Sequence, residues 1–405
     1  MELRLSMRVI VIGAGIVGAS AALTLAEQGS DVIVVDRGLV GCEASGLNAG
    51  LIGGGGWGEQ PDVDVALSMG SLERYIHLAD DLGHDISLDR TGTLILIRTE
   101  EEWEWAKTSV DGNRSTGRCF ELVDSQALRT LEPAADPSLL GAIFDPLAGH
   151  AEPVRATQAF AAAAVIQGAD VRTGCGVTDL RQLRGGGWQV DVATDGQPSQ
   201  VSVDAVVIAA GPWSNEIGRM VGIDIPVVAV RGQMWASAPQ PRVLRHGIAA
   251  AESACQWMTE DLVDGVPPNL THHDGRRMTR HLYGRQRPNG EIVFGGDRVL
   301  TNDRTIDLAG IAVNHDHTGE LFPGFAGRAP SRTWSGLMPF SLDGRPLIGP
   351  VSGREGLFVA GGLASSGFGR GPMTGQFVAE LVMGIESDYD LASVLVGDRV
   401  TLIDG

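Results

Sequence analysis

The chain opens with a short apolar run, a helical pattern and a second apolar run. Val9–Ile12 consists of β-branched residues, which is typical of a strand buried on both faces. Apolar residues then recur at helical spacing from Ala21 to about Gln28, and Gly29 follows where such a helix would end. Asp31–Val35 is again a short apolar run. The pattern predicts a strand, a helix and a second strand at the start of the chain.

The first predicted turn carries the glycine pattern Gly13-x-Gly15-x-x-Gly18. In a dinucleotide-binding unit the first glycine turns the chain, the second lets backbone approach a pyrophosphate, and the third lets helix pack on strand. The helix N-terminus then offers amide N–H groups to the phosphates. Asp36 ends the second strand, where a carboxylate can accept both ribose hydroxyls. Strand, turn, helix, strand and acid occur in order, so a dinucleotide site is favoured over a glycine-rich turn without a ligand.

Two distant stretches add strands to this unit. Val203–Ala210 predicts a buried strand followed by a helix from Asn215, and a further β-pattern begins at Asp170. Leu357–Ala360 predicts a strand that leads into a glycine-rich turn and a helix from about Pro372 to Met383. A nucleotide domain assembled from three parts of the chain suits a long cofactor gripped at both ends. No second G-x-G-x-x-G both follows a predicted strand and opens a predicted helix, so an NAD(P)H site is not predicted.

Composition narrows the class of protein. The 405 residues are 43% hydrophobic and 20% charged, as in globular proteins, and the length suggests two or three domains. A net charge of −19 argues against binding to nucleic acid or anionic membranes. The chain contains no uninterrupted apolar run of about 20 residues, so a membrane span is not predicted. The four scattered cysteines suggest neither a disulfide framework nor a zinc site, and they favour a reducing, cytoplasmic location.

Six segments together resemble the D-amino-acid oxidase superfamily of FAD-dependent oxidoreductases, nearest to glycine oxidase, sarcosine oxidase and related amine dehydrogenases. The segments are Val9–Gly38, Ala44–Ile52, Val206–Ser214, Gly290–Asp297, Thr333–Gly349 and Gly356–Gly375. The resemblance implies a fold of class α/β plus α+β. We expect a Rossmann-type FAD-binding domain from residues 1–52, 150–216 and 330–405, and an antiparallel-sheet substrate (cap) domain from residues 53–149 and 217–329.

The resemblance also implies a set of FAD-binding residues. Those at the adenosine and pyrophosphate end are Gly13, Gly15, Ile16, Val17, Gly18, Asp36, Arg37 and, beside the adenine, Val177. Those that follow the cofactor towards its isoalloxazine ring are Ser45, Ala49, Gly50 and Leu51, with Gly367, Phe368 and Gly369 against the ring. Further expected cofactor-binding residues are Gly211, Trp213, Gly336 and Gly362. Relatives with covalent flavin carry a cysteine at this C-terminal turn. It is absent here, so we expect non-covalent FAD.

A hairpin is predicted where His281–Arg287 and Glu291–Asp297 flank Pro288-Asn289-Gly290. Strand alternation places His281, Tyr283 and Arg285 on one face. The resemblance assigns His281 and Tyr283 to the catalytic face, with Tyr283 orienting the substrate; the alternative is a strand tyrosine packed on the core. It also places Arg298 nearby, although alternation turns Arg298 to the other face unless Gly295-Gly296 forms a bulge.

The expected carboxylate anchors are missing. Glycine and D-amino-acid oxidases bind the substrate carboxylate through an arginine at the position of Met338, and glycine oxidase adds one at the position of Ser365. Met338 and Ser365 therefore line the predicted substrate site in their place. Either another arginine takes over, with Arg285, Arg298 and Arg370 as candidates, or the substrate lacks a carboxylate near the flavin. We favour a substituted amine, an imino acid or a larger amino compound over glycine.

The implied reaction is hydride transfer from the carbon that bears nitrogen to flavin N5, followed by hydrolysis of the imine. Sarcosine-oxidase relatives place a lysine over the flavin to promote reaction with oxygen. Lys107 is the sole lysine and lies in a charged helical pattern, so we expect a dehydrogenase, or an oxidase that uses histidine or arginine instead. The expected electron acceptor is O2, a quinone or a partner protein. The sequence leaves open whether the chain forms a homo-oligomer. The alternatives are a 2-hydroxy-acid dehydrogenase and an electron-transfer flavin subunit of a hetero-oligomer.

Two histidine clusters and a glycine run lie outside these motifs. His272-His273-Asp274 and His315-Asp316-His317 lack a further ligand at suitable spacing, so we expect solvated loops or helix starts and no metal site. The glycine run Gly53–Gly58, with Trp57, follows the flavin-side turn and could act as a lid over the site.

Overall fold

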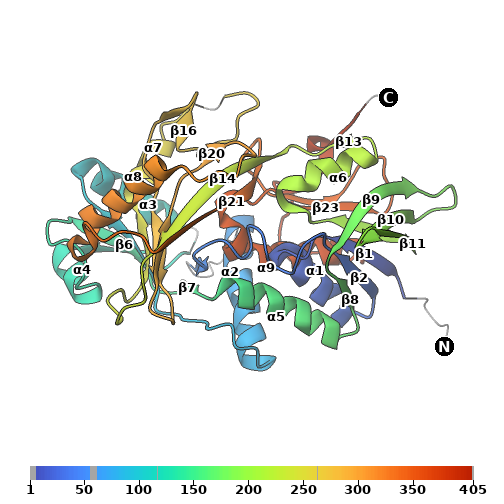
Figure 1. The fold of residues 1–405 in the computed structure, drawn as a ribbon, viewed down its shortest axis with the longest axis horizontal. Helices are drawn as coiled ribbons and strands as arrows, with labels where there is room; N and C mark the ends of the chain where they lie inside the picture. Colours follow the sequence, from blue (N-terminus) through green and yellow to red (C-terminus); the bar gives the residue numbers. More distant parts are fainter. Residues whose placement is uncertain (1–5, 55–61, 116, 262, 404–405) are drawn as a thin grey trace.

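The computed structural model of the chain describes residues 6–54, 62–115, 117–261 and 263–403. These residues form two large sheets with their helices, which lie side by side in Figure 1, and several smaller sheets. The three-part assembly predicted for the nucleotide domain is present, because strands from the beginning, middle and end of the chain share one sheet.

The first sheet of the described residues is six-stranded and mostly parallel. In spatial order its strands are β22 (Leu347–Pro350), β23 (Leu357–Gly361), β12 (Ala205–Ile208), β1 (Arg8–Ile12), β2 (Asp31–Val35) and β8 (Asp170–Arg172). Only β22, at one edge, runs antiparallel to its neighbour. The inner residues of β1 and β2 are buried, as their unbroken apolar runs predicted.

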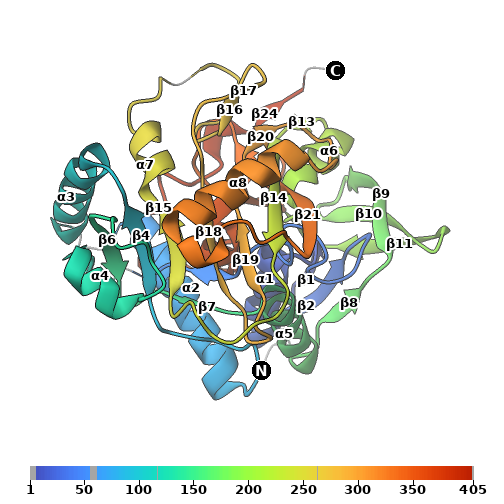
Figure 2. The same cartoon turned by 60° about the vertical axis from the view of Figure 1, so that its left-hand side comes forward.

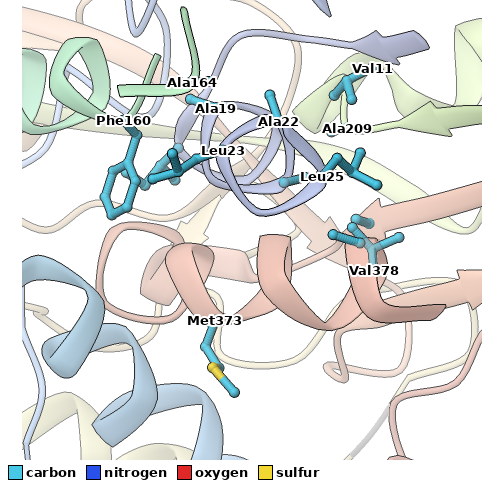
Figure 3. Close-up of a cluster of buried hydrophobic side chains, with 14 of the residues drawn as sticks. Val11, Ala19, Ala22, Leu23, Leu25, Phe160, Ala164, Ala209, Met373 and Val378 are labelled. Carbon is cyan, nitrogen blue, oxygen red and sulfur yellow. The ribbon is translucent and has the colours of Figure 1, made fainter. Parts of the chain in front are cut away.

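Helices cover one face of this sheet and a smaller sheet covers the other. The helices are α1 (Ile16–Glu27), α5 (Pro153–Ile166), α9 (Gly367–Val382) and α2 (Val63–Ile76), which is followed by a π-helical turn at His77–Asp81. Figure 3 shows how α1 meets α5 and α9 through small and branched residues such as Ala19, Ala22 and Val378. The opposite face packs on β9 (Cys175–Gln182), β10 (Trp188–Thr194) and β11 (Gln197–Val203).

The second sheet of the described residues is nine-stranded and mostly antiparallel. Its strands are β4 (Thr93–Ile97), β5 (Glu121–Asp124), β6 (Gly141–Asp145), β14 (Val227–Ala236), β15 (Gly247–Ala250), β18 (Tyr283–Gln286), β19 (Ile292–Gly295), β20 (Val299–Leu300) and β21 (Arg332–Ser341). Its helices are α3 (Glu100–Ser115), α4 (Ser125–Leu131), α7 (Ala251–Trp257) and α8 (Leu308–Leu321). Helix α8 lies across the face formed by β14 and β19 (Figure 2).

Short elements connect these layers. They are β3 (Leu51–Ile52) paired with β7 (Gly149–His150), β13 (Ile223–Asp224) paired with β24 (Thr401–Leu402), β16 (His272–His273) paired with β17 (Arg276–Arg277), α6 (Ser214–Met220), and 3-10 turns at Gly211–Trp213, Pro323–Phe325, Ala364–Ser366 and Gly397–Arg399.

Two elements lie on the other side of the predicted domain division. Strand β21 falls in the 330–405 segment assigned to the FAD domain, yet it pairs along its length with β14 in the second sheet. Helix α2 falls in the 53–149 segment assigned to the substrate domain, yet Leu67 and Tyr75 join the core under α1 and α9. The chain therefore crosses between the two domains more often than the predicted segments imply.

Helix α9 begins earlier than predicted, at Gly367 instead of near Pro372. A proline inside a helix leaves the carbonyl four residues earlier without its N–H partner. That carbonyl belongs to Phe368, and the buried hydroxyl of Tyr75 donates to it at 2.8 Å. Because Tyr75 supplies the missing hydrogen bond, the helix passes through Pro372 and its N-terminus moves to Gly367.

Candidate active site

A cavity of about 600 Å³ lies between the two sheets. The turns after β1, β12 and β23 line it from the first domain, and β14, β21 and the residues around β18 and β19 line it from the second. Its volume is in the range of small-molecule sites. One continuous space therefore touches both the predicted cofactor segments and the predicted substrate hairpin.

The glycine pattern shapes one end of this cavity by close packing. Gly13 has a φ of +113°, and a Cβ there would lie 2.4 Å from the Ala209 carbonyl oxygen. A Cβ on Gly18 would lie 1.9 Å from the carbonyl oxygen of Gly13. Gly18 stands behind the cavity wall, where its lack of a side chain lets α1 approach β1.

The start of α1 offers amide donors to the cavity. Gly15 is the N-cap residue and gives no side-chain cap, and the first turn carries no acidic residue. The Ser45 hydroxyl accepts from the Ile16 amide at 2.9 Å, which leaves other first-turn amides for a ligand. Ile16 and Val17 line the cavity beside them. This is the arrangement that a pyrophosphate group requires.

Asp36 lies where the second strand ends, as predicted. Its two carboxylate oxygens accept from the amides of Ala14 and Gly38, each at 2.7 Å, and the side chain lines the cavity. The Arg37 guanidinium lies 4.2 Å from the ring centre of Trp213. With Val177 and Gly211, these residues form the wall expected to hold the adenosine.

The start of α9 forms the opposite end of the cavity. Gly367, Phe368 and Gly369 line it, and the helix has no side-chain cap and no acidic residue in its first turn. Leu51 of β3 lies next to this turn, since a Cβ on Gly369 would be 3.5 Å from its carbonyl oxygen. The N-termini of two helices, each without a cap from its own N-cap residue, thus face one cavity, which fits an extended dinucleotide with an electron-rich ring at its far end.

Besides Gly18, three predicted cofactor residues lie behind the wall and do not line the cavity. Gly50 has a φ of +79°, and a Cβ there would meet the carbonyl oxygen of Ala151 at 2.0 Å. The carbonyl oxygen of Ala49 accepts a hydrogen bond from Nε of the buried Arg285. Gly362 has a φ of +69° and packs on Ser341. These residues shape the backbone, whereas Gly336 on β21 lines the cavity itself.

The predicted substrate residues gather at the cavity wall formed by the second sheet. Those that line it are His281, Tyr283, Arg298, Met338 and Ser365. The predicted hairpin is present, with strands β18 and β19 and a turn at Gly290, whose φ is +87°. Strands from the hairpin, β21 and the C-terminal turn therefore meet at one place.

A bulge turns Arg298 into the cavity. Met234 of β14 pairs with Gly295, and Arg231 of β14 pairs with Val299. Between these two pairs, the segment from β19 to β20 contains one more residue than β14 does, which defines a bulge. Gly296 lies in this bulge, and a Cβ there would be 1.8 Å from the carbonyl oxygen of His281. The extra residue reverses the alternation that would have pointed Arg298 away.

Arg298 is a buried cation without a carboxylate partner among the described residues. Its side chain is 8% exposed, and burial lowers its pKa to about 9, although the nearby Tyr283 phenol opposes this shift. The guanidinium lies 4.1 Å from the ring centre of Trp257 and donates to the Asn269 carbonyl at 3.2 Å. Its Nε is buried and has no partner in the described structure. A buried arginine of this kind is expected to bind an anion.

His281 and Tyr283 lie beside this guanidinium. The two rings stack with centres 5.7 Å apart. Burial, followed by the charge of Arg298, holds the pKa of His281 well below its ordinary value. Burial raises the pKa of the Tyr283 phenol to about 12, so the hydroxyl is neutral at physiological pH. A neutral phenol and a neutral imidazole suit the positioning of a ligand next to a cation.

Arg285 and Arg370 have partners of their own. Arg285 is 1% exposed, lies outside the cavity wall and donates from Nη2 to Ala151 and Glu152 at 2.9 and 2.7 Å. It therefore supports the turn around Gly50 and is not placed as a substrate ligand. Arg370 lines the cavity but pairs with Asp64 at 2.8 Å. Of the three alternative arginines, Arg298 alone combines burial, a cavity position and a lack of acidic partners among the described residues.

Sequence reasoning missed some residues of the wall. Gln233 on β14 donates to Asp297 at 2.7 Å, and Asp297 also pairs with Arg277. Both Gln233 and Asp297 line the cavity next to Arg298. Asp297 ends the Gly290–Asp297 segment and could have been noticed there, whereas no motif marks Gln233.

The histidine clusters have structural partners, and the expectation of a solvated loop or helix start is wrong for His315 and His317, which lie buried within α8. His273 on β16 pairs with Glu260, and the buried His317 of α8 lies 3.7 Å from Glu252. Within the described residues, no three potential ligands gather into a metal site. Gly53 and Gly54 line the cavity, while the rest of the proposed lid, with Trp57, lies outside the described residues.

Comparison with known proteins agrees with this geometry. The family model of FAD-dependent oxidoreductases, DAO, matches residues 8–381. The chain is 28% identical to glycine oxidase of Geobacillus kaustophilus over 95% of each protein. It is 29% identical to D-amino acid dehydrogenase of Rhizobium rhizogenes over 96% of this chain and 99% of the relative. The chain belongs to the DAO family of FAD-dependent oxidoreductases, and the resemblance seen in its motifs is confirmed.

Solved structures give the same result for the fold. The crystal structure of glycine oxidase from Geobacillus kaustophilus superposes with a TM-score of 0.80 at 25% identity, covering 97% of this chain and 99% of that chain. L-proline dehydrogenase from P. horikoshii has a TM-score of 0.80 at 23% identity, with 95% and 96% covered, and shares the fold. The predicted fold class and the predicted FAD-dependent amino-acid oxidase or dehydrogenase class are confirmed. None of the described helices is long and apolar enough to span a membrane.

Proposed function

We propose that this chain holds FAD without a covalent bond and oxidises the C–N bond of an amino or imino acid whose carboxylate binds Arg298. The observation that carries the proposal is the buried guanidinium at the cavity wall, which has no acidic partner in the described structure. A substrate carboxylate would supply the missing counter-charge. The relatives named glycine oxidase and D-amino acid dehydrogenase support a substrate that carries an amino group and a carboxylate.

The residues present fit FAD. The uncapped start of α1 suits the pyrophosphate, Asp36 suits the ribose, and the uncapped start of α9 suits the pyrimidine edge of the ring. Cys175 lines the cavity but lies on β9 beside Val177, at the adenosine end, and Ser365 and Ser366 occupy the C-terminal turn. This supports non-covalent binding. When bound, FAD accepts the hydride from the carbon that carries the nitrogen.

The protein's own task is to position the substrate. Arg298 binds the carboxylate, and the Tyr283 hydroxyl beside it orients the substrate because it is neutral and can donate or accept a hydrogen bond. His281, which the sequence suggested as catalytic, already accepts a hydrogen bond from Arg298 through Nε2. We therefore propose that His281 positions Arg298 and does not remove a proton from the amine.

Met338 shapes the site by its volume. Its Cε would lie 3.0 Å from a Cβ on Gly232 of β14, so the thioether fills the space over this glycine. Met338 makes the wall apolar at the position where the glycine oxidases carry an arginine. The cation of this site is Arg298 instead, which lies on the other side of β14. An apolar wall supports a substrate with a hydrocarbon portion, such as an imino acid or a larger amino acid, over glycine.

For the electron acceptor we propose a dehydrogenase, or an oxidase that relies on histidine or arginine. Lys107 is the only lysine of the chain, and it lies exposed on α3, where it pairs with Glu104 at 2.6 Å. It is not among the residues that line the cavity. A quinone or a partner protein then stands beside O2 as a candidate acceptor.

Anaerobic reduction of the holoenzyme tests the proposal. The panel contains glycine, D-alanine, L-proline and sarcosine, the amines that lack their carboxylates, and the matching 2-hydroxy acids. We expect an amino or imino acid to bleach the flavin fastest and its decarboxylated amine to react at least about tenfold more slowly. Faster reduction of the flavin by a 2-hydroxy acid would favour a 2-hydroxy-acid dehydrogenase. Absence of reduction by every compound, with turnover only after a partner is added, would favour an electron-transfer subunit.

A further inference from the structure

The Arg298 guanidinium is held by groups that come from two neighbouring elements. Its Nη2 lies 3.0 Å from His281 Nε2, just before β18. The ring of Trp257 stacks on it from the end of α7, and the same ring lies 5.1 Å from that of His281. Ser253, also on α7, places its hydroxyl 2.7 Å from His281 Nδ1. A chain of contacts thus runs from Ser253 through His281 to Arg298.

The contacts fix the protonation of His281. An arginine N–H can only donate, so Nε2 must accept and carries no proton. The neutral ring then bears its proton on Nδ1, which donates to the Ser253 oxygen. A protonated ring, or the other tautomer, would set two donors against each other at 3.0 Å. Burial and the charges of Arg298 and His317, which lower the pKa of His281, act in the same direction.

Helix α7 is fastened so that it can serve as a support. Ser253 and Trp257 are four residues apart and lie on the same side of this helix. Glu252, in the first turn of α7, accepts from Arg280 at 2.6 Å and from Arg98 at 3.3 Å. Arg280 directly precedes His281, so one ion-pair cluster ties α7 to the segment that carries the histidine.

We propose that Ser253 and His281 are positioning residues, which hold the Arg298 guanidinium in the orientation that receives the substrate carboxylate. This inference rests on the proposed function, because it needs Arg298 to bind that carboxylate. An arginine side chain has several rotatable bonds, and holding it in one rotamer before binding removes an entropic cost. The positioning residues therefore affect the affinity for carboxylates without touching the ligand.

The test compares carboxylate binding by variants of the holoenzyme. Acetate is the charged probe and acetamide its neutral counterpart, and each is titrated by the perturbation of the flavin absorption spectrum. The variants are His281→Leu, His281→Gln, Ser253→Ala and Arg298→Met. Ser202→Ala is the matched control, because its hydroxyl contacts Gln189 on the β10–β11 pair, away from the cavity.

We expect His281→Leu to weaken acetate binding about tenfold and Ser253→Ala about threefold, with acetamide unchanged. His281→Gln should recover most of the affinity, because its amide oxygen can accept from Arg298 where Nε2 does. Ser202→Ala should bind as the unchanged protein does. Ring ¹⁵N spectra of the unchanged holoenzyme should show His281 protonated on Nδ1 and unprotonated on Nε2.

The outcomes separate this inference from the proposed function. If Arg298→Met binds acetate normally, Arg298 is not the anchor and the proposed function fails. If Arg298→Met loses acetate while His281→Leu and Ser253→Ala keep it, only the positioning role is refuted. A proton on Nε2 in the ¹⁵N spectra also refutes it, and this measurement needs no variant that folds.

Discussion

Replacing Arg298 by methionine should affect stability and binding in opposite directions. The guanidinium is buried, and burial lowers its pKa from the ordinary value to about 9. A shift of this size corresponds to roughly 5 kcal/mol against the charged form in the folded protein. The hydrogen bonds to Asn269 and His281 recover part of it. An apolar side chain of similar length removes the penalty, so we expect a net stabilisation of about 1–3 kcal/mol.

The same substitution should weaken the binding of carboxylates. Loss of a buried, charge-assisted contact costs about 2–4 kcal/mol, which is about 30- to 1,000-fold in affinity. Thermal unfolding without ligand should therefore show a melting temperature about 1–4 °C higher for Arg298→Met. Titration with acetate, or kcat/KM for the best substrate, should show the loss.

Arg285→Met is the matched control for this experiment. Arg285 lies on β18 and is also buried, but it pairs with Glu152 at 2.7 Å. Removing its guanidinium leaves the Glu152 carboxylate without this ion pair, so the protein should lose about 3 kcal/mol of stability. If Arg298→Met is destabilising to the same degree and leaves acetate binding intact, Arg298 is a structural cation and the reasoning is refuted.

Three further substitutions or conditions test the structure. Tyr75→Phe removes the donor to the Phe368 carbonyl and should cost about 1–3 kcal/mol in urea unfolding, while Tyr389→Phe, on a half-buried tyrosine, should cost less. Gly18→Ala places a Cβ 1.9 Å from the Gly13 carbonyl oxygen, so the purified protein should lose FAD, measured by its absorbance ratio; full flavin content would contradict the predicted packing. Burial lowers the pKa of His150 and His317 to about 4, so the unfolded chain binds more protons between pH 6.5 and 4. Stability should therefore fall by about 1 kcal/mol per histidine for each pH unit below 6.5, and His317→Gln should flatten this dependence in urea unfolding at pH 7.5 and 5.5.

The cofactor end of the cavity was predictable because its rules are local. Gly13, Gly15 and Asp36 lie within one strand–turn–helix–strand unit, and the spacing of such a unit already determines where its turn and its acid lie. The start of α9 was harder to predict. Its position depends on Tyr75, which is far from Pro372 in the sequence and reaches it only through the packing of α2 on α9.

The substrate end depends on contacts that no local pattern contains. Alternation correctly grouped His281 and Tyr283, which line the cavity, but it could not show that Arg285 finds Glu152 beneath the Gly50 turn. The orientation of Arg298 depended on whether Gly295-Gly296 forms a bulge, which the sequence left open. Strand register across β14 decides it, and register is a property of the assembled sheet.

Gly296 shows how a residue without a side chain can determine what the site binds. Its backbone approaches His281 so closely that a Cβ would overlap the His281 carbonyl oxygen. The imidazole of His281 lies 3.0 Å from the guanidinium, and the bulge around Gly296 turns Arg298 towards the cavity. One glycine thus lies both in the bulge that precedes Arg298 and against the backbone of His281. The carboxylate anchor that we propose is consequently a property of strand register and backbone packing, and an arginine at this position in a regular strand would face away from the cavity.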